Sequence, residues 1–404
     1  MTADVASRTT GPPDHRTTGP PHHRTTVSLK RMSDTPFGTF FIPGPTEVRP
    51  ELLSQMTRPV IGHRGKNFEG MFARIEAGLR DVFLTARPVY VGATSATGFM
   101  EMAIRNTPEG EILSLVNGGF SERFAKVAES CERRVERVVV PWGATFDLNV
   151  VESALASKKF AAVTVAHSET STGVISDVRA IAELAHKHGA FAIVDSVSGA
   201  GGAEIMVDAW GLDFMLTGSQ KALALPAGLA FAVASSDYIA RAKTVKNRGF
   251  YFDVLQYEAF AEKNQTPSTP ATSILYALEA QMGDIGREGI ERRWDRHIAM
   301  REFTVEWVQA AAKRRDLEIG ILAPEGIRSP TVSVITLPSG MNTKEVREAI
   351  NARGFTVGGG YGQLSDTTFR IGHMGDHTVD GVKRCLQACE TAIAEIAERK
   401  RLGR

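Results

Sequence analysis

Cysteine, net charge and long apolar runs are all scarce in this sequence, and each scarcity argues against a class of protein. The 404 residues include three cysteines, Cys131, Cys385 and Cys389, without the spacing of a metal site. We therefore expect a reducing cytoplasm and no bound metal. The formal net charge of +1 gives no electrostatic case for binding nucleic acid or an anionic membrane. No apolar run approaches the length of a membrane-spanning helix.

The length of the chain indicates two domains, and its composition indicates where they begin. Residues 1–36 repeat an Arg-Thr-Thr-Gly-Pro-Pro motif from Arg8 and from Arg16, and the motif starts again at Arg24. Such a segment cannot bury a core, so we expect a disordered tail. Its histidines, His15, His22 and His23, leave adventitious metal binding as an alternative. We place a large domain at 37–285 and a smaller one at 286–404.

Apolar strands alternate with helical patterns through the predicted large domain. This order predicts an α/β fold with a doubly wound, mostly parallel sheet whose two faces are covered by helices. Ligands then collect at the carboxyl ends of the strands. The strands are expected at 88–91, 112–116, 135–140, 161–165, 191–195, 213–216 and 229–233.

The C-terminal part has a sparser pattern that predicts a smaller α+β domain. A helix from about residue 271 and a long amphipathic helix over roughly 286–312 lead into it. Strands are expected at 331–335, 355–357 and 368–371, and helices at 344–353 and 379–398.

Two polar residues at strand ends indicate chemistry. Lys221 is the one charge in the run 216–228, between two apolar strands, and burial would lower its pKa. A neutral amine is the form that attacks a carbonyl carbon. Asp195 ends another apolar strand. A snorkelling lysine and an exposed turn aspartate are the alternatives, but together a lysine and an acid suit pyridoxal phosphate.

A turn of small residues, 92–98, leads into a predicted helix. Ser95, Ala96 and Thr97 stand where a helix N-terminus offers free N–H groups and a positive dipole end to an anion. We place the cofactor phosphate here. The alternative is an ordinary N-cap by Ser95 or Thr97.

Several short motifs then occur in one order along the chain. They are Pro43-Gly44-Pro45-Thr46, Gly62-His63-Arg64, His167-Ser168-Glu169-Thr170-Ser171-Thr172-Gly173, Asp195-Ser196-Val197-Ser198-Gly199, Ser219-Gln220-Lys221-Ala222-Leu223 and Phe369-Arg370-Ile371-Gly372. The set, which covers roughly 37–397, resembles the class V aminotransferases of pyridoxal phosphate fold type I. It is most similar to the alanine–glyoxylate and serine–glyoxylate (serine–pyruvate) group.

The resemblance implies roles for the residues around the cofactor. Lys221 would hold the cofactor and act as general base, and Asp195 would keep the pyridine nitrogen protonated. The aromatic ring of Phe120 would stack on the pyridine. The remaining cofactor contacts implied in the same chain are Thr170, whose hydroxyl could bind O3′, and Val197 and Gln220.

The resemblance also implies substrate contacts and a homodimer. Arg370 would clamp the substrate α-carboxylate, with Gly44 nearby; an internal carboxylate partner is the alternative for a charged residue in an apolar strand. The loop containing Thr269 would reach the phosphate of the partner subunit.

The implied reaction is transamination of a small amino acid, alanine or serine, with a 2-oxo acid, glyoxylate or pyruvate. Another class V donor such as phosphoserine is the first alternative, and a non-catalytic subunit of a complex is the second. Cysteine desulfuration is disfavoured, because the desulfurases of the resembled superfamily have a histidine just before the lysine and a nucleophilic cysteine on a later loop. In this sequence Gln220 precedes Lys221, and no cysteine lies between Cys131 and Cys385.

Overall fold

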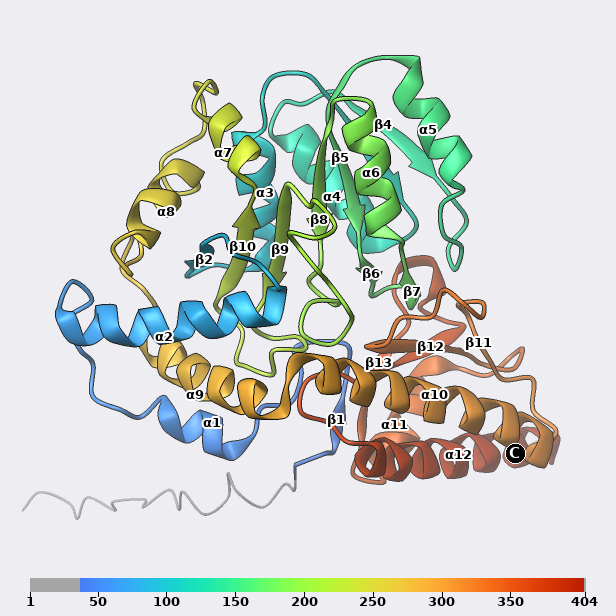
Figure 1. The fold of residues 1–404 in the computed structure, drawn as a ribbon. Helices are drawn as coiled ribbons and strands as arrows, with labels where there is room; N and C mark the ends of the chain where they lie inside the picture. Colours follow the sequence, from blue (N-terminus) through green and yellow to red (C-terminus); the bar gives the residue numbers. More distant parts are fainter. Residues whose placement is uncertain (1–36, 403–404) are drawn as a thin grey trace, which may run out of the picture. The chain divides into compact units, whose positions relative to one another are not determined.

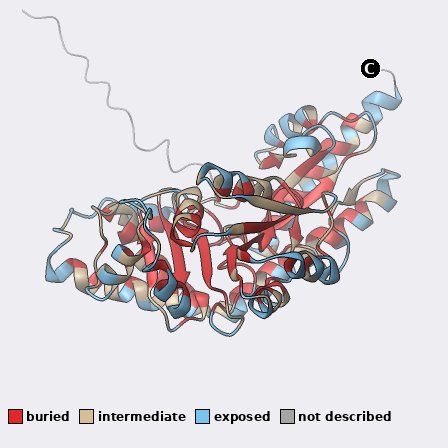
Figure 2. Ribbon diagram, turned by 90° about the horizontal axis from the view of Figure 1, so that it is seen from above, coloured by how far each residue is buried: buried red, intermediate tan, exposed pale blue. Residues whose placement is uncertain are grey.

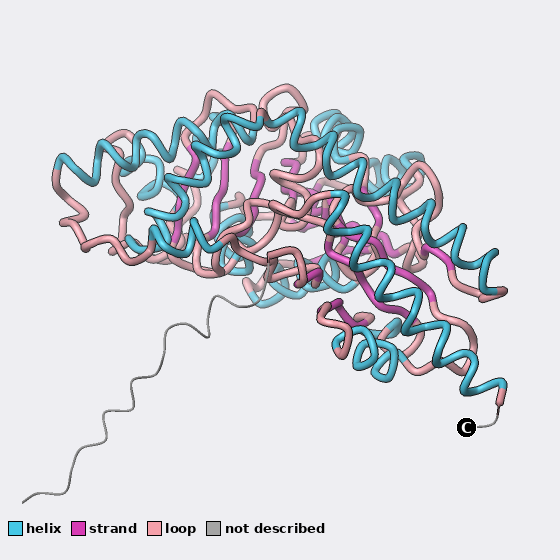
Figure 3. Tube along the Cα trace, turned by 90° about the horizontal axis from the view of Figure 1, so that it is seen from below, coloured by secondary structure: helices cyan, strands magenta, loops and turns pink. Residues whose placement is uncertain are grey.

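A computed structural model describes residues 37–402 of the chain. The predicted tail over 1–36, with its histidines, lies outside these residues. In the described part, strands and helices alternate, and helices lie on both sides of the strands (Figure 3). No helix between residues 37 and 402 is both long enough and apolar enough to cross a bilayer.

A seven-stranded sheet forms the centre of the first part of the chain (Figure 1). The predicted mostly parallel arrangement is confirmed, because only β10 runs antiparallel to its neighbours. The order across the sheet is β2 (Val89–Gly92), β10 (Ala230–Ala234), β9 (Phe214–Gly218), β8 (Phe191–Asp195), β5 (Phe160–Ala166), β3 (Glu111–Val116) and β4 (Val135–Val139).

Helices cover both faces of this sheet because successive strand residues point to opposite sides. Ile112 packs into one apolar cluster, whereas Leu113 and Leu115 pack into the other. Buried residues are concentrated in the strands between the layers (Figure 2). One cluster is built with α2 (Lys66–Phe83), α5 (Leu148–Ser157), α6 (Val178–Lys187) and α9 (Thr272–Glu288). The other uses α3 (Ala96–Asn106), α4 (Gly119–Ser130), α7 (Ser236–Ala242) and α8 (Val254–Ala261).

A second, five-stranded sheet carries its own apolar cluster. Its order is β1 (Phe40–Phe41), β13 (Thr356–Gly359), β14 (Thr368–Gly372), β12 (Val332–Thr336) and β11 (Gly320–Ile321). The cluster is completed by α10 (Ile290–Arg315), α11 (Thr343–Asn351) and α12 (Val379–Arg401). The short elements that remain are α1 (Pro50–Gln55), the 3-10 helix η2 (Gly362–Leu364), and the hairpin of β6 (Ser168–Glu169) and β7 (Val174–Ile175).

Two details differ from expectation. Gly289, at φ +84°, separates α9 from α10, so the long helix begins at Ile290 rather than near 286. A left-handed glycine ends one helix and lets the next start in a new direction. In addition, β1 pairs in parallel with β13, so residues near the start of the predicted large domain belong to the second sheet. The domain boundary between 285 and 286 stays a prediction.

Candidate active site

Lys221 lies in the turn between the central strands β9 and β10, and its side chain is buried. Lys221 as a whole is 8% exposed, and its Nζ donates a hydrogen bond to the carbonyl oxygen of Pro43. Burial and, after it, the guanidinium of Arg370 lower the pKa of Lys221 to about 8, although Asp195 opposes the shift. A substantial fraction of this amine is therefore neutral near physiological pH.

Asp195 is the last residue of β8, the strand next to β9. One carboxylate oxygen, Oδ1, accepts a hydrogen bond from the N–H of Val197 at 2.9 Å. Burial raises the pKa of Asp195 to about 7, and the Val197 hydrogen bond opposes this shift. Within the described residues Oδ2 has no hydrogen-bond partner, so this oxygen is available to a ligand.

One cavity of about 330 Å³ contains both side chains. This volume is within the range of roughly 300–1,000 Å³ typical of small-molecule sites. The cavity brings together all the predicted site residues except Thr269 and Arg370. Its lining is Gly44, Pro45, Ser95, Ala96, Thr97, Met100, Phe120, Arg123, Ser168, Thr170, Asp195, Val197, Ser198, Gln220, Lys221 and Ala227.

The N-terminus of α3 forms one wall of the cavity. Ser95 is the N-cap residue, but its side chain makes no capping hydrogen bond, and no acidic residue occurs in the first turn. The N-terminal end of the helix is thus available to an anion, as a phosphate group requires. The amine of Lys221, the free oxygen of Asp195 and this helix end together fit pyridoxal phosphate.

Gly44 lies against the lysine side chain. Its φ is +120°, and a Cβ at this position would lie 2.6 Å from Cε of Lys221. Any other residue would therefore combine backbone strain with a collision against the buried amine. The glycine allows the chain after β1 to approach Lys221 closely.

Arg370 lies in β14, just outside the lining of the cavity. Its Nε donates to the carbonyl of Gly359 at 2.7 Å, and its Nη1 donates to the carbonyl of Thr170, a lining residue, at 3.2 Å. None of the carboxylates between residues 37 and 402 forms an ion pair with it. The alternative of an internal acidic partner is therefore not found, and the guanidinium has donors left for a ligand.

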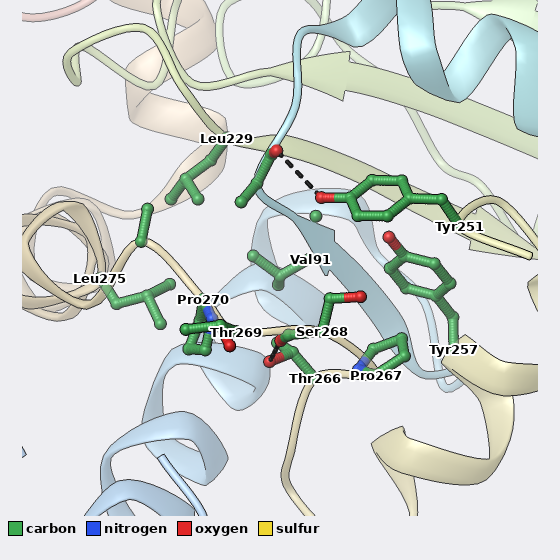
Figure 4. Close-up of a pocket in the computed structure, with 13 residues that line it drawn as sticks. Val91, Leu229, Tyr251, Tyr257, Thr266, Pro267, Ser268, Thr269, Pro270 and Leu275 are labelled. Atoms are coloured by element: carbon green, nitrogen blue, oxygen red, sulfur yellow. Dashed lines mark hydrogen bonds between the residues drawn. The ribbon is translucent and has the colours of Figure 1, made fainter. Parts of the chain in front are cut away.

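Thr269 lies away from the cavity in this single chain. Figure 4 shows it in the loop 266–270, which lines a separate hollow with Val91 and Leu229. Arg64, from the Gly62-His63-Arg64 motif, donates to the carbonyl of Thr266 at 2.7 Å and so holds this loop. Thr269 was predicted to contact a partner subunit, and since the structure describes a single chain, this contact stays a prediction.

Sequence reasoning assigned no role to two charged residues of the site, Arg123 and Glu169. Arg123 lines the cavity from α4, one helical turn after Phe120. Glu169 is fully buried beneath the start of α4 and accepts hydrogen bonds from the N–H groups of Phe120 and Ser121. Arg123 could have been found from its spacing, because residues three apart share one face of a helix and Phe120 was already predicted to face the cofactor.

Comparison with known proteins agrees with this geometry. The aminotransferase class-V family matches residues 55–363. An uncharacterised aminotransferase of Methanocaldococcus jannaschii is 36% identical, with 88% of this chain and 92% of the relative covered. L-aspartate–glyoxylate aminotransferase of Paracoccus denitrificans is 32% identical, covering 90% and 93%.

A solved structure extends the comparison to the fold. Alanine–glyoxylate aminotransferase from Nostoc sp. superposes with a TM-score of 0.82 at 28% identity, covering 88% of this chain and 94% of that one. The resemblance deduced from the motifs is therefore confirmed. The chain belongs to the class V aminotransferases, enzymes of fold type I that depend on pyridoxal phosphate.

Proposed function

We propose that the enzyme transfers the amino group of a small amino acid, alanine or serine, to a small 2-oxo acid, glyoxylate or pyruvate. The observation that carries this proposal is the pairing of Lys221 and Asp195 in one cavity with opposite pKa shifts. Glyoxylate is favoured as the acceptor because it is named in both the Paracoccus relative and the Nostoc structure.

The residues around the cavity are proposed to hold the cofactor at three points. The start of α3 would bind the phosphate, the ring of Phe120 would stack on the pyridine, and Oδ2 of Asp195 would accept a hydrogen bond from the protonated pyridine nitrogen. When bound, pyridoxal phosphate supplies the electron sink that stabilises negative charge at the substrate Cα. The proposed cofactor-binding residues of the same chain are Ser95, Ala96, Thr97, Phe120, Thr170, Asp195, Val197, Gln220 and Lys221.

Lys221 is proposed as the general base. Its lowered pKa leaves Nζ able to take a proton from the substrate Cα near neutral pH and to return it later. The carbonyl of Pro43 and the absence of a side chain at Gly44 fix where this amine lies.

Arg370 is proposed to bind the α-carboxylate that amino acids and 2-oxo acids share. A guanidinium matches a carboxylate with two parallel hydrogen bonds. Its two bonds to backbone carbonyls hold it at the edge of the cavity. Gly44 is proposed to lie beside the same carboxylate, because it has no side chain next to Lys221.

We further propose that two copies of the chain complete each other's phosphate site through Thr269, and that the enzyme works in the cytoplasm. The hydrogen bonds of Arg64 to the loop 266–270 support a loop held in a fixed shape for this contact. A phosphoserine donor, or a role as a non-catalytic subunit, are the competing functions.

An absorbance spectrum and a panel of substrates test these proposals together. The purified enzyme with cofactor should absorb in the visible or near-ultraviolet band of lysine-bound pyridoxal phosphate, and a non-catalytic subunit should not. Alanine is then assayed with glyoxylate, and serine and phosphoserine are each assayed with glyoxylate and with pyruvate. Turnover of phosphoserine alone, or no turnover with any pair, would reject the proposed reaction.

A further inference from the structure

Arg123 presents an unpaired positive charge to the active-site cavity. It lines the cavity, its Cζ lies 4.8 Å from the centroid of the Phe120 ring, and its Nη2 donates to the hydroxyl of Tyr361 at 3.2 Å. Over the range 37–402 no carboxylate forms an ion pair with it. Because a guanidinium has five N–H donors, most of its capacity is unused in the chain alone.

Nearby acids are committed to other partners. Glu122, the preceding residue, pairs with Arg137 at 3.2 Å and with Lys126 at 3.8 Å. Both oxygens of the buried Glu169 accept hydrogen bonds from the start of α4 and from Ser171. Arg123 is thus left facing the cavity, where a ligand can supply the missing anion.

Tyr361 connects this charge to the proposed α-carboxylate site. The Cζ of Arg370 lies 5.6 Å from the centroid of the Tyr361 ring, and the same ring lies 5.2 Å from that of Phe120. Two guanidinium groups, neither paired with an acid, therefore contact one tyrosine at the border of one cavity. A small molecule with an anionic group at each end is the kind of ligand that both guanidinium groups could bind around Tyr361.

The phosphate of the cofactor is a weaker candidate for this anion. The N-terminus of α3, free of a side-chain cap and of acidic residues, already offers it a place. Arg123 comes instead from α4 and is bonded to Tyr361, on the side of Arg370.

We propose that Arg123 binds a second carboxylate, so that the enzyme accepts aspartate as a further class of donor. The inference rests on the proposed function. The C–N bond at the aspartate Cα breaks, and this carbon is oxidised to the ketone of oxaloacetate. The amino group and the Cα hydrogen reach glyoxylate, whose C=O bond breaks as the new C–N bond of glycine forms. The oxygen lost by glyoxylate leaves as water, and water supplies the ketone oxygen of oxaloacetate. The α-carboxylate is held by Arg370 and the β-carboxylate by Arg123, beside the hydroxyl of Tyr361.

The test compares aspartate with 2-aminobutyrate, in which a methyl group replaces the β-carboxylate. The holoenzyme is assayed with glyoxylate and each donor. The parent should have the higher kcat/KM for aspartate, and Arg123→Gln should lower the ratio of the two values about ten- to a hundredfold. Arg123→Lys, which keeps the charge, should recover part of that ratio. Lys126→Gln, an exposed change on the same helix, should leave the ratio unchanged.

A binding measurement separates recognition from turnover. Succinate and butyrate, which have no amino group to transfer, are titrated calorimetrically into the holoenzyme. Succinate should bind more tightly to the parent, and Arg123→Gln should abolish that preference.

The outcomes are distinguishable. If 2-aminobutyrate turns over and the parent does not prefer aspartate, or if Arg123→Gln lowers both donors equally, the second-carboxylate site is wrong. An equal loss for both donors would instead assign Arg123 to the cofactor or to the position of Phe120. If neither donor turns over in the parent while alanine or serine does, the second-carboxylate site is wrong and the proposed function stands. If alanine and serine also fail with glyoxylate, the proposed transamination itself fails.

Discussion

The carboxylate of Glu169 accepts a hydrogen bond from the backbone N–H of Ser121, the residue after Phe120, at 2.8 Å. The same carboxylate accepts from the N–H groups of Phe120 and Ser171. A buried anion at a helix N-terminus satisfies free donors and interacts favourably with the dipole. Glu169 therefore fixes the start of α4, from which both Phe120 and Arg123 reach the cavity.

Replacing this carboxylate should loosen the start of α4. Glu169→Gln removes the charge and turns an N–H₂ group toward donors, so we expect a loss of about 1.5–3 kcal/mol in the free energy of unfolding. Chemical denaturation measures it, with Glu129→Gln, at the exposed end of the same helix, as the control. Equal stability of the Glu169 variant and the parent would contradict the role of the carboxylate.

Removing the amine of Lys221 should stop the reaction without unfolding the protein. Lys221→Ala is expected to lower kcat by at least about 10²–10⁴-fold, the usual contribution of a general base. Circular dichroism should match the parent, because a buried amine of lowered pKa is costly to keep. The exposed Lys187→Ala is the control. Turnover by Lys221→Ala near the parental rate would end the assignment.

Arg370→Lys should weaken donor and acceptor together. Lysine keeps the charge but lacks the planar fork, so about 1.5–3 kcal/mol of binding to a charged group is lost, or roughly ten- to a hundredfold in kcat/KM. Arg134→Lys, at an arginine whose side chain is 89% exposed, serves as the control. If both half-reactions are unchanged, Arg370 is structural, and His63 and Arg64 become the next candidates for the clamp.

Cofactor retention should depend on the partner subunit. If Thr269 completes the phosphate site of the second copy, Thr269→Ala should increase cofactor loss on dialysis. Activity and cofactor content should also fall together when dilution produces monomers. Light scattering with parallel assays follows both quantities, and a monomer with full activity and bound cofactor would contradict the proposal.

Asp376 should stabilise the fold in a pH-dependent way. It accepts from Nε of Arg49 at 2.6 Å and from Nη2 of Arg293 at 2.9 Å, and these arginines lower its pKa against the effect of burial. Because the folded pKa lies below the unfolded value of about 3.9, the stabilisation is present above that value and is lost as pH falls through the folded pKa.

The variant Asp376→Asn leaves two arginines without this carboxylate. We expect about 3–5 kcal/mol of destabilisation at pH 7, and a smaller difference from the parent below about pH 4. Urea denaturation across this range measures it, with the exposed Asp295→Asn on α10 as the control. A difference that is constant with pH would show that the ion pairs are not its cause.

The sheet and the position of the site were predictable because their signals are local. One apolar run ends in Asp195, and another is followed closely by Lys221, so each carries a polar group at its carboxyl end. Because the two strands are parallel neighbours, these ends lie side by side. The break at Gly289 was misplaced because the helical spacing of apolar residues continues around it. Only its positive φ reveals where one helix ends and the next begins.

Other features depend on contacts distant in sequence. An arginine on an amphipathic helix is usually solvated, and only the approach of Tyr361 from a loop after β13 shows that Arg123 faces the cavity. The strand β1 is two residues long, and its partner β13 lies near the other end of the chain. No periodicity in the sequence links such segments.

The pairing of β1 with β13 has a consequence for synthesis. Phe40 and Phe41 leave the ribosome early, but Thr356 and Val357, which pair with them, leave it late. Pro43, whose carbonyl accepts the bond from Lys221, follows β1 directly. Domains tend to fold as they emerge, starting from the N-terminus. A nascent chain that has built the seven-stranded sheet therefore still lacks the anchor for Pro43, and the lysine gains its native surroundings only after residues 356–357 have been synthesised.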